Sequence, residues 1–329
     1  MLKKWIALAM AAVFVLSISG AAMAAGKLVK VPTAWMDEHE TFLIWYAKEK
    51  GWDKEAGLDV EIKYFNSGAD ILNALPSGEW VFAGMGAVPA MLGNLRYDTI
   101  IIGNGNDESM TNGVVVRKDS PIAKVKGWNK DYPDVLGLKD SDVVIKNMDQ
   151  AQAVGAFENN IGDGVALWAP HLFLAMDKGG VLAADLKMCK KGNPIVLIAD
   201  AKYANAHPEI TAKFLGIYLR AVNMLQKESA ESLVPEYRRF FLEWAGKDYD
   251  KGLALKDIQK HPVYNLEEQL VMFDDSKGQS QAQKWQGEIA EFFTTVGRIT
   301  PEEAKKVKDG KYATNKFLKQ VQTPIPSYK

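Results

Sequence analysis

The sequence predicts an α/β protein of two lobes, each a mostly parallel sheet flanked by helices, with a helical C-terminal region. Three observations lead to this fold class. Short apolar strands alternate with helical segments from residue 28 to residue 103, as in a mostly parallel sheet. The strand Gly113–Arg117 then leaves the first lobe, and Ile195–Ala199 returns to it. The long segment after residue 207 has helical periodicity alone.

An export signal opens the chain. Two lysines precede the apolar run Trp5–Ile18, and Ala22-Met23-Ala24 has the small-x-small pattern of a cleavage site. The run is too short for a comfortable membrane span, and no Cys follows it to carry a lipid anchor. We therefore predict that residues 1–24 are a signal peptide, cleaved after about Ala24, and that the mature protein works in the periplasm.

The composition limits the partners and the chemistry. The 40 basic and 41 acidic residues give a net charge of −1, so we expect no broad basic surface for nucleic acid or anionic lipid. Cys189 is the only cysteine, which excludes an internal disulfide. The four histidines have no paired spacing, and HExxH, CxxC and GxSxG are missing. We therefore predict no metal, no cofactor and no enzyme activity.

The first lobe begins with a strand, a helix and a strand. Leu28–Val31 is the first strand, and Pro32–Glu38 is predicted as a loop. Asp37 and Glu40 have the spacing of a capping box at the start of the helix, which Gly51 ends. Leu58–Tyr64 alternates apolar and charged residues, so it predicts a second strand joined by a right-handed crossover.

The same alternation continues to residue 103. A helix begins near Ser67 and stops at Pro76, and the strand Trp80–Met85 follows it. A helix over Ala87–Leu95 leads to a strand over Thr99–Gly103. The glycines of Gly103-Asn104-Gly105 lack the later glycine of a dinucleotide fingerprint, so this tripeptide is predicted as a turn.

The second lobe is an insertion into the first. Its predicted elements are the strand Val143–Ile145, the helix Asp149–Glu158, the strand Val165–Trp168 and the helix Leu172–Lys178. Beyond the return strand, His207–Leu225 is a long amphipathic helix, and capping boxes begin helices at Asn265 and Thr300. His207 and His261 both precede Pro and are predicted at helix starts. The resulting domains are residues 27–116 plus 195–329 for lobe one and residues 117–194 for lobe two.

Four segments carry a family resemblance: residues 42–90, 113–122, 147–170 and 201–215, which include SGADILNALPSGE and VALWAP. They resemble the periplasmic substrate-binding proteins of ABC importers, in the taurine-, alkanesulfonate- and nitrate-binding branch of the thiamine-pyrimidine-synthase-like superfamily. The resemblance implies a type II periplasmic-binding-protein fold whose lobes close by hinge motion on a small anionic or zwitterionic ligand. It further implies a monomer that delivers its ligand to an ABC permease of the inner membrane.

The chain departs from this family at Val135-Leu136. Family members continue from the GVVVRKDSPI segment into a further strand and helix, and the strand-plus-helix unit of about 25 residues is missing here. That unit resembles the part of lobe two that grips the anionic end of the ligand. We therefore expect a smaller second lobe than is usual for the family.

Two short turns are candidate anion-binding positions in lobe one. Backbone N–H groups at helix starts hold anions, and small residues let the ligand approach closely. The candidates are Ser67 and Gly68 at one helix start and Gly86, Ala87 and Val88 at the next. The alternative is that these are ordinary turn residues.

Acidic residues crowd two loops that follow strands. Asp37, Glu38 and Glu40 lie in the first loop, and Asp107 and Glu108 lie in the fourth. Carboxylates there can pair with a ligand ammonium group, although helix capping also explains Asp37 and Glu40. Glu38 is the preferred candidate among them, and Asp107 is the candidate from the fourth loop.

Tryptophan and histidine complete the predicted site. Trp35 and Trp168 each follow a strand, where an indole can wall an apolar cleft and donate one hydrogen bond. His171, after Pro170, is a further candidate to line the cleft, although a lone histidine is more often structural.

Two rival functions use the same fold. The first is an enzyme of the pyrimidine-synthase type, whose chemistry needs several clustered histidines; no such cluster is visible in the sequence. The second is a sensory binding protein that docks on a membrane receptor. Recovering a candidate ligand unchanged after incubation distinguishes a binding protein from the enzyme. The sequence does not distinguish a sensory binding protein from a transport one, because these differ only in the membrane protein on which they dock.

Overall fold

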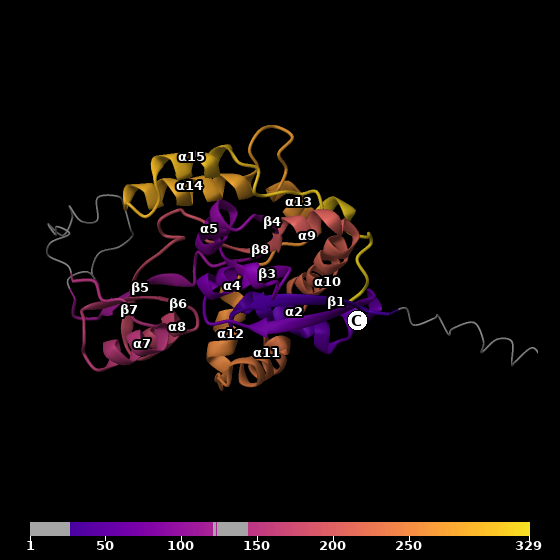
Figure 1. Ribbon diagram of the computed structural model, residues 1–329. Coiled ribbons are helices and arrows are strands. Elements are labelled where there is room, and N and C mark those ends of the chain that lie inside the picture. The colour runs from indigo at the N-terminus through magenta and orange to yellow at the C-terminus, as the bar shows by residue number, and fades with distance from the viewer. Residues whose placement is uncertain (1–26, 121–122, 124–143) are drawn as a thin grey trace, which may run out of the picture.

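The computed structural model describes residues 27–120, 123 and 144–329. The predicted signal peptide and the position Val135-Leu136 lie outside the described residues. Within them, the chain forms a five-stranded sheet and a separate three-stranded sheet, each with its own helices (Figure 1). Among the described helices none is long and apolar enough to cross a membrane.

The larger sheet contains four strands of one direction and one of the opposite direction. Its strands are β1 Val29–Trp35, β2 Leu58–Tyr64, β3 Phe82–Gly86, β4 Thr99–Asp107 and β8 Pro194–Asp200. Their order is β2-β1-β3-β8-β4, with β1 parallel to β2 and β3, and β8 antiparallel to β3 and β4. The alternation of strands and helices predicted for lobe one is confirmed, and β8 is the predicted return strand.

Helices cover this sheet and bury its apolar side chains. They are α2 His39–Glu49, α3 Trp52–Glu55, α4 Gly68–Ala74, the 3-10 turn η1 Leu75–Ser77, α5 Ala87–Arg96, α9 Ala201–Ala206 and α10 Pro208–Lys227. The core includes Trp35, Phe82, Phe214 and Tyr218, which pack in ring contact from β1 and β3 to α10. The stripe of apolar residues predicted on the long helix is the face of α10 that enters this core.

Two loop predictions in lobe one are wrong. β1 continues through Pro32–Trp35, because β2 pairs with all four of these residues and β3 pairs with Thr33 and Ala34. β4 continues past the predicted turn at Gly103-Asn104-Gly105 with two bulges. A Cβ at Gly103 would lie 3.2 Å from the Gln269 Oε1, and a Cβ at Gly105 would lie 3.2 Å from the Glu40 Cβ. The glycines therefore permit close packing across the strand and form no turn.

The smaller sheet contains β5 Asn112–Arg117, β6 Gly164–Trp168 and β7 Gly180–Asp185, with α7 Gln150–Glu158 and α8 His171–Asp177 beside it (Figure 1). The prediction of a mostly parallel sheet is wrong for this lobe, because β5 is antiparallel to both β6 and β7. β5 enters the lobe between two strands that both run against it. The predicted strand at residues 143–145 is also not confirmed, since Val144 and Ile145 are exposed and lie outside any strand.

The C-terminal region is almost all helical, as predicted. It contains α11 Ala230–Ala245, α12 Lys251–Lys260, α13 Leu266–Met272, α14 Gln281–Thr295, α15 Pro301–Asp309 and the 3-10 turn η4 Leu318–Gln320. Both predicted capping boxes form, at Asn265 and at Thr300. A second apolar cluster connects the lobes, since Leu172 and Phe173 of α8 share it with Phe42 of α2 and with Tyr237 and Phe240 of α11.

Candidate functional site

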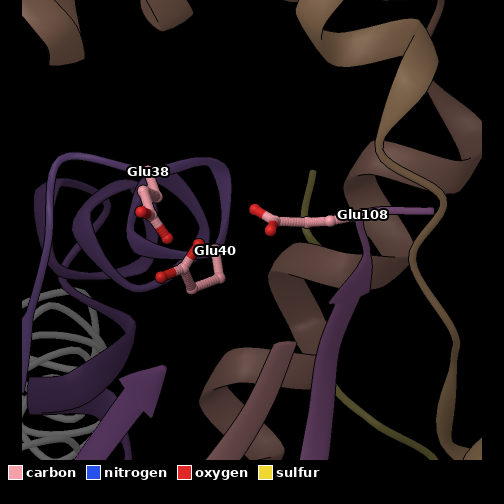
Figure 2. A group of neighbouring side chains, drawn as sticks. All are labelled: Glu38, Glu40 and Glu108. Atoms are coloured by element: carbon pink, nitrogen blue, oxygen red, sulfur yellow. The ribbon is translucent and has the colours of Figure 1, made fainter. Parts of the chain in front are cut away.

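Three glutamates converge from separate parts of the chain. Glu38 is the N-cap residue of α2, Glu40 lies in the first turn of that helix, and Glu108 follows the end of β4. Each of the three offers a carboxylate oxygen, and these oxygens all lie within 4.8 Å of one another. Figure 2 shows the Glu108 carboxylate directed across to the pair on α2. The cluster lies at the carboxyl ends of strands, where open α/β sheets hold ligands.

Burial makes this cluster costly to ionise. Glu40 is fully buried, and neither of its carboxylate oxygens has a hydrogen-bond partner. Burial, and next the charge of Glu108, raises the pKa of Glu40 to about 8. Burial, and next the charges of Glu40 and Glu108, also holds the pKa of Glu38 well above its usual range. Glu40 therefore retains its proton near neutral pH unless a further positive charge lies beside it.

Glu108 is followed by a chain of polar contacts: His261 lies beside Glu108, Asp257 lies beside His261, and Tyr237 donates a hydrogen bond to Asp257. The His261 Nε2 is 3.8 Å from the Glu108 Oε1, and its Nδ1 is 3.2 Å from the Asp257 Oδ1. The Tyr237 hydroxyl donates to the Asp257 Oδ2 at 2.8 Å and accepts from the His39 Nδ1 at 2.9 Å. The two imidazole rings stack with centroids 4.6 Å apart.

The two stacked histidines have opposite pKa shifts. Burial lowers the pKa of His261, but Asp257 and Glu108 outweigh burial, so that its pKa is raised well above the usual value. Burial, and next the charge of His261, lowers the pKa of His39 well below the usual value. The arrangement therefore favours the protonated form of the His261 ring and the neutral form of the His39 ring.

A cavity of about 340 Å³ lies between the smaller lobe and the C-terminal helices. It is lined by Pro170, His171, Leu174, Lys247, Asp248, Tyr249, Asp250 and Leu253. The His171 Nδ1 is buried without a partner, and burial followed by the charge of Lys247 lowers the pKa of this histidine. Burial is the main reason for the raised pKa of Tyr249, and Asp37 and Glu38 are close enough to add to it. The cavity is therefore near the glutamate cluster.

The predicted site residues separate into groups in the structure. Trp35 does not line a cleft; it is fully buried, stacks on Tyr218 with centroids 6.2 Å apart, and donates to the Thr33 hydroxyl. Its place in the core follows from the extension of β1, and we withdraw it as a ligand-binding residue. Trp168 is 40% exposed at the end of β6 and stays a prediction, as does His171 on the cavity wall.

The acidic loops have different roles from those predicted. Asp37 forms an ion pair with Lys247 and makes no cap, since α2 has no side-chain cap bond. Asp107 accepts from the backbone N–H groups of Ser109 and Asn193, so its carboxylate holds a turn. The preference for Glu38 stays a prediction, and we propose Glu40 and Glu108 beside it. Nothing in their local sequence distinguishes these two from capping or solvated acids.

The two candidate anion-binding turns have structural roles that are visible. The Ser67 hydroxyl accepts from the Asp70 N–H and caps α4. A Cβ at Gly68 would lie 2.6 Å from the Pro89 Cγ, so glycine permits α4 to pack on α5. Gly86 is the N-cap residue of α5, and Ala87 and Val88 form its first turn. A ligand role for these residues stays a prediction.

His261 was predicted at the wrong end of a helix, and its contact with His39 was not predicted. His207 begins α10 as predicted, but His261 follows the last turn of α12. His39 and His261 are 222 positions apart in sequence, and only the fold stacks them. The sequence carried no signal for this contact, because neither histidine has a paired spacing.

The fold is that of the periplasmic binding proteins. The aliphatic sulphonate-binding protein SsuA from Escherichia coli has a TM-score of 0.63 to this chain at 16% identity, and the match covers 86% of this chain and 99% of SsuA. The nitrate-binding protein NrtA from Synechocystis PCC 6803 has a TM-score of 0.63 at 14% identity, with 92% of each chain covered. These matches confirm the predicted fold class.

Sequence comparison identifies relatives in the same group. The chain is 26% identical over 310 residues to a putative aliphatic sulfonates-binding protein of Bacillus subtilis, covering 87% of this chain and 90% of that protein. It is 24% identical over 186 residues to the taurine-binding periplasmic protein of Escherichia coli, covering 49% and 56%. The NMT1/THI5 like family model matches residues 39–130. The predicted resemblance to this group of binding proteins is thereby confirmed.

Proposed function

We propose that this chain is the solute-binding component of an ABC importer, exported to the periplasm, with its ligand held between residues 27–116 plus 195–329 and residues 117–194. The observation that carries the proposal is the cavity between α8 and the α11–α12 connection, beside three converging glutamates. The relatives and structural neighbours, which are named for sulfonate, taurine and nitrate binding, support the same role.

The proposed ligand is small and anionic or zwitterionic, in the class of sulfonates and taurine. Its anionic group would be held by backbone N–H groups at Ser67-Gly68 and Gly86-Ala87-Val88. The indole of Trp168 and the ring of His171 would contact its body from the smaller lobe. Hinge closure of the two lobes would then remove the ligand from water.

A thermal-shift screen of sulfonates, nitrate and amino acids on the purified protein tests this proposal. A ligand present at a hundred times its Kd adds about 2.7 kcal/mol to the free energy of unfolding, an effect that is easily measured. No shift with any sulfonate or with nitrate, together with a shift from an unrelated class, would contradict the proposed ligand class.

The same material distinguishes binding from catalysis. We propose that the ligand is released unchanged, because the chain carries the fold of binding proteins and delivers its ligand to a permease. Mass spectrometry of the ligand after prolonged incubation is expected to recover the starting compound. A converted product would favour an enzyme of the pyrimidine-synthase type.

A further inference from the structure

We propose that Glu38, Glu40 and Glu108 together bind one divalent cation of the size and hardness of Ca²⁺. This assignment goes beyond solute binding, because it gives the glutamate cluster a ligand of its own. Three independent features of the cluster lead to it: the spacing of the oxygens, the buried polar atoms without partners, and the balance of charge.

The spacing of the oxygens fits a large hard cation. Ca²⁺ binds oxygen at about 2.3–2.6 Å, so two ligands on opposite sides of the ion lie at most about 4.6–5.2 Å apart. The three carboxylate oxygens all lie within 4.8 Å of one another, which is inside the span of one Ca²⁺ (Figure 2). Ca²⁺ accepts flexible arrangements of carboxylates, whereas Mg²⁺ demands near-ideal octahedral geometry at about 2.0–2.1 Å and keeps several waters, so a cluster of three carboxylates favours Ca²⁺.

Buried polar atoms point to a ligand. Glu40 is 0% exposed, both of its oxygens have no hydrogen-bond partner, and one of its oxygens lies within 4.8 Å of an oxygen of each of the other two glutamates. Asn106 is also 0% exposed, and both polar atoms of its side chain have no partner. It precedes Glu108 by two residues in the chain, and its amide oxygen is of the chemical kind that Ca²⁺ accepts.

The balance of charge favours a divalent ion over an organic ammonium. In the described part of the chain, the recorded ion-pair contact of the three glutamates is the one from the His261 Nε2 to the Glu108 Oε1, at 3.8 Å, and the same ring lies 3.2 Å from Asp257. A monovalent ammonium would offset one of the three carboxylates, whereas a divalent cation offsets two. The three glutamates of the cluster offer carboxylate oxygens, which favours Ca²⁺ or Mn²⁺ over softer metals.

A bound cation would change which ligands the cleft accepts. Three carboxylates repel an anionic ligand, and a divalent ion offsets most of that negative charge and offers the anion a direct positive contact. This consequence rests on the proposed function, since it concerns the sulfonate-class ligand. The cation site itself does not depend on it and is tested without any organic ligand.

The test is a metal titration of the chelator-treated full mature protein. Ca²⁺, Mn²⁺, Mg²⁺ and Zn²⁺ are added singly, and binding is followed by isothermal titration calorimetry and by the midpoint of thermal unfolding. We expect Ca²⁺ and Mn²⁺ to bind with one site per chain and to raise the midpoint. Glu40→Gln and Glu108→Gln keep the side-chain shape but remove charge, and each is expected to weaken Ca²⁺ binding at least about tenfold.

The control is Glu302→Gln, which changes an exposed glutamate on α15 and should bind Ca²⁺ as the parent does. Circular dichroism of each variant checks that it is folded. The proposal is overturned if no metal shifts the midpoint, or if Glu40→Gln and Glu108→Gln bind Ca²⁺ as the parent does. The proposal is also overturned if no metal changes the midpoint of thermal unfolding, while taurine raises it and Glu40→Gln abolishes the taurine effect. In that case the cluster binds the ammonium group of taurine. Ca²⁺ binding without binding of any sulfonate supports the cation site and contradicts the proposed function.

Discussion

Glu38 and Trp168 are both partly exposed, and each lies at the end of its element. Neither side chain is needed to fill the apolar core. Trp35, by contrast, is part of that core, so its substitution would confuse a loss of binding with a loss of folding. The useful variants for the site are therefore those that leave the packing intact.

Glu38→Ala and Trp168→Ala are each expected to weaken ligand binding while the protein stays folded. The first removes a carboxylate of the cluster, and the second removes an indole that faces solvent from the smaller lobe. Affinity for the best compound of the thermal-shift screen is measured by calorimetry, and folding by circular dichroism. If both variants bind as the parent does, the site is misplaced.

The pKa of His171 predicts a pH effect on stability. Burial and Lys247 lower this pKa in the folded protein, so the folded chain holds fewer protons there than the unfolded chain below about pH 6.5. The stabilisation from the neutral ring is present above that pH and is lost as the pH falls toward the folded-state pKa. His171→Gln removes this group, and urea unfolding of both proteins at about pH 7.5 and about pH 5 compares them. The parent should lose more free energy of unfolding than the variant, and equal losses would exclude the effect.

Close contacts between elements depend on glycine at a few positions. A Cβ at Gly84 of β3 would lie 2.7 Å from the Trp35 Cε3 and 3.1 Å from the Glu40 Cγ. This glycine thus lets the sheet approach both the aromatic core and the first turn of α2. The fit of these elements sets where Glu40 lies.

Gly84→Ala is expected to cost about 1–3 kcal/mol in the free energy of unfolding, because the added methyl group overpacks the core. Gly155→Ala is the matched control, since nothing lies within 4 Å of a Cβ on that residue of α7. Urea unfolding measures both variants. Equal stability of the two would contradict the packing argument.

The elements could be predicted largely from periodicity, but their partners could not. Alternation of strands and helices located α2, α5 and α10, and sequence spacing located both capping boxes. The extension of β1 through Pro32 was missed, because Pro and the polar residues after it are typical of a loop. The pairing that keeps this segment in the sheet comes from neighbouring strands, which the local sequence does not reveal. β7 was missed because its six residues are short and contain no marked alternation.

The site was partly predictable for a similar reason. Glu38 was preferred because helix capping accounts for the acidic residues beside it but not for Glu38 itself, and its role as a ligand-binding residue stays a prediction. The convergence of Glu108 on α2, and the contact of His39 with Tyr237 at 198 positions' separation, depend on tertiary packing that no local pattern encodes. Trp35 was misassigned because the end of β1 was placed four residues too early.

At the scale of the whole molecule, two lobes share an apolar cluster and enclose a cavity. The ion pair between Lys256 of α12 and Asp177 of α8 also joins them, at 2.9 Å. This pair is exposed and adds at most about 1 kcal/mol, so it does not prevent the lobes from separating. The proposed function requires such a movement.

Binding is therefore expected to make the mature protein more compact in solution. Small-angle X-ray scattering with and without taurine measures the radius of gyration, and the bound state should have the smaller value, since hinge closure brings the lobes together. Glu38→Ala at the same taurine concentration is the control and should show less compaction. An unchanged radius at saturating taurine would exclude hinge closure with this compound.

The two chain crossings between the lobes run side by side. The Glu108 N–H donates to the Asn193 carbonyl, and the Lys187 N–H donates to the Ser109 carbonyl, each at 2.9 Å. Glu108 thus lies in one of these crossings, while Glu38 and Glu40 belong to the start of a helix that packs on the larger sheet. The proposed closure of the lobes would therefore move the carboxylate of Glu108 relative to that pair. Closure and the spacing of the three carboxylates would then be coupled, so that a ligand or ion that fixes one also fixes the other.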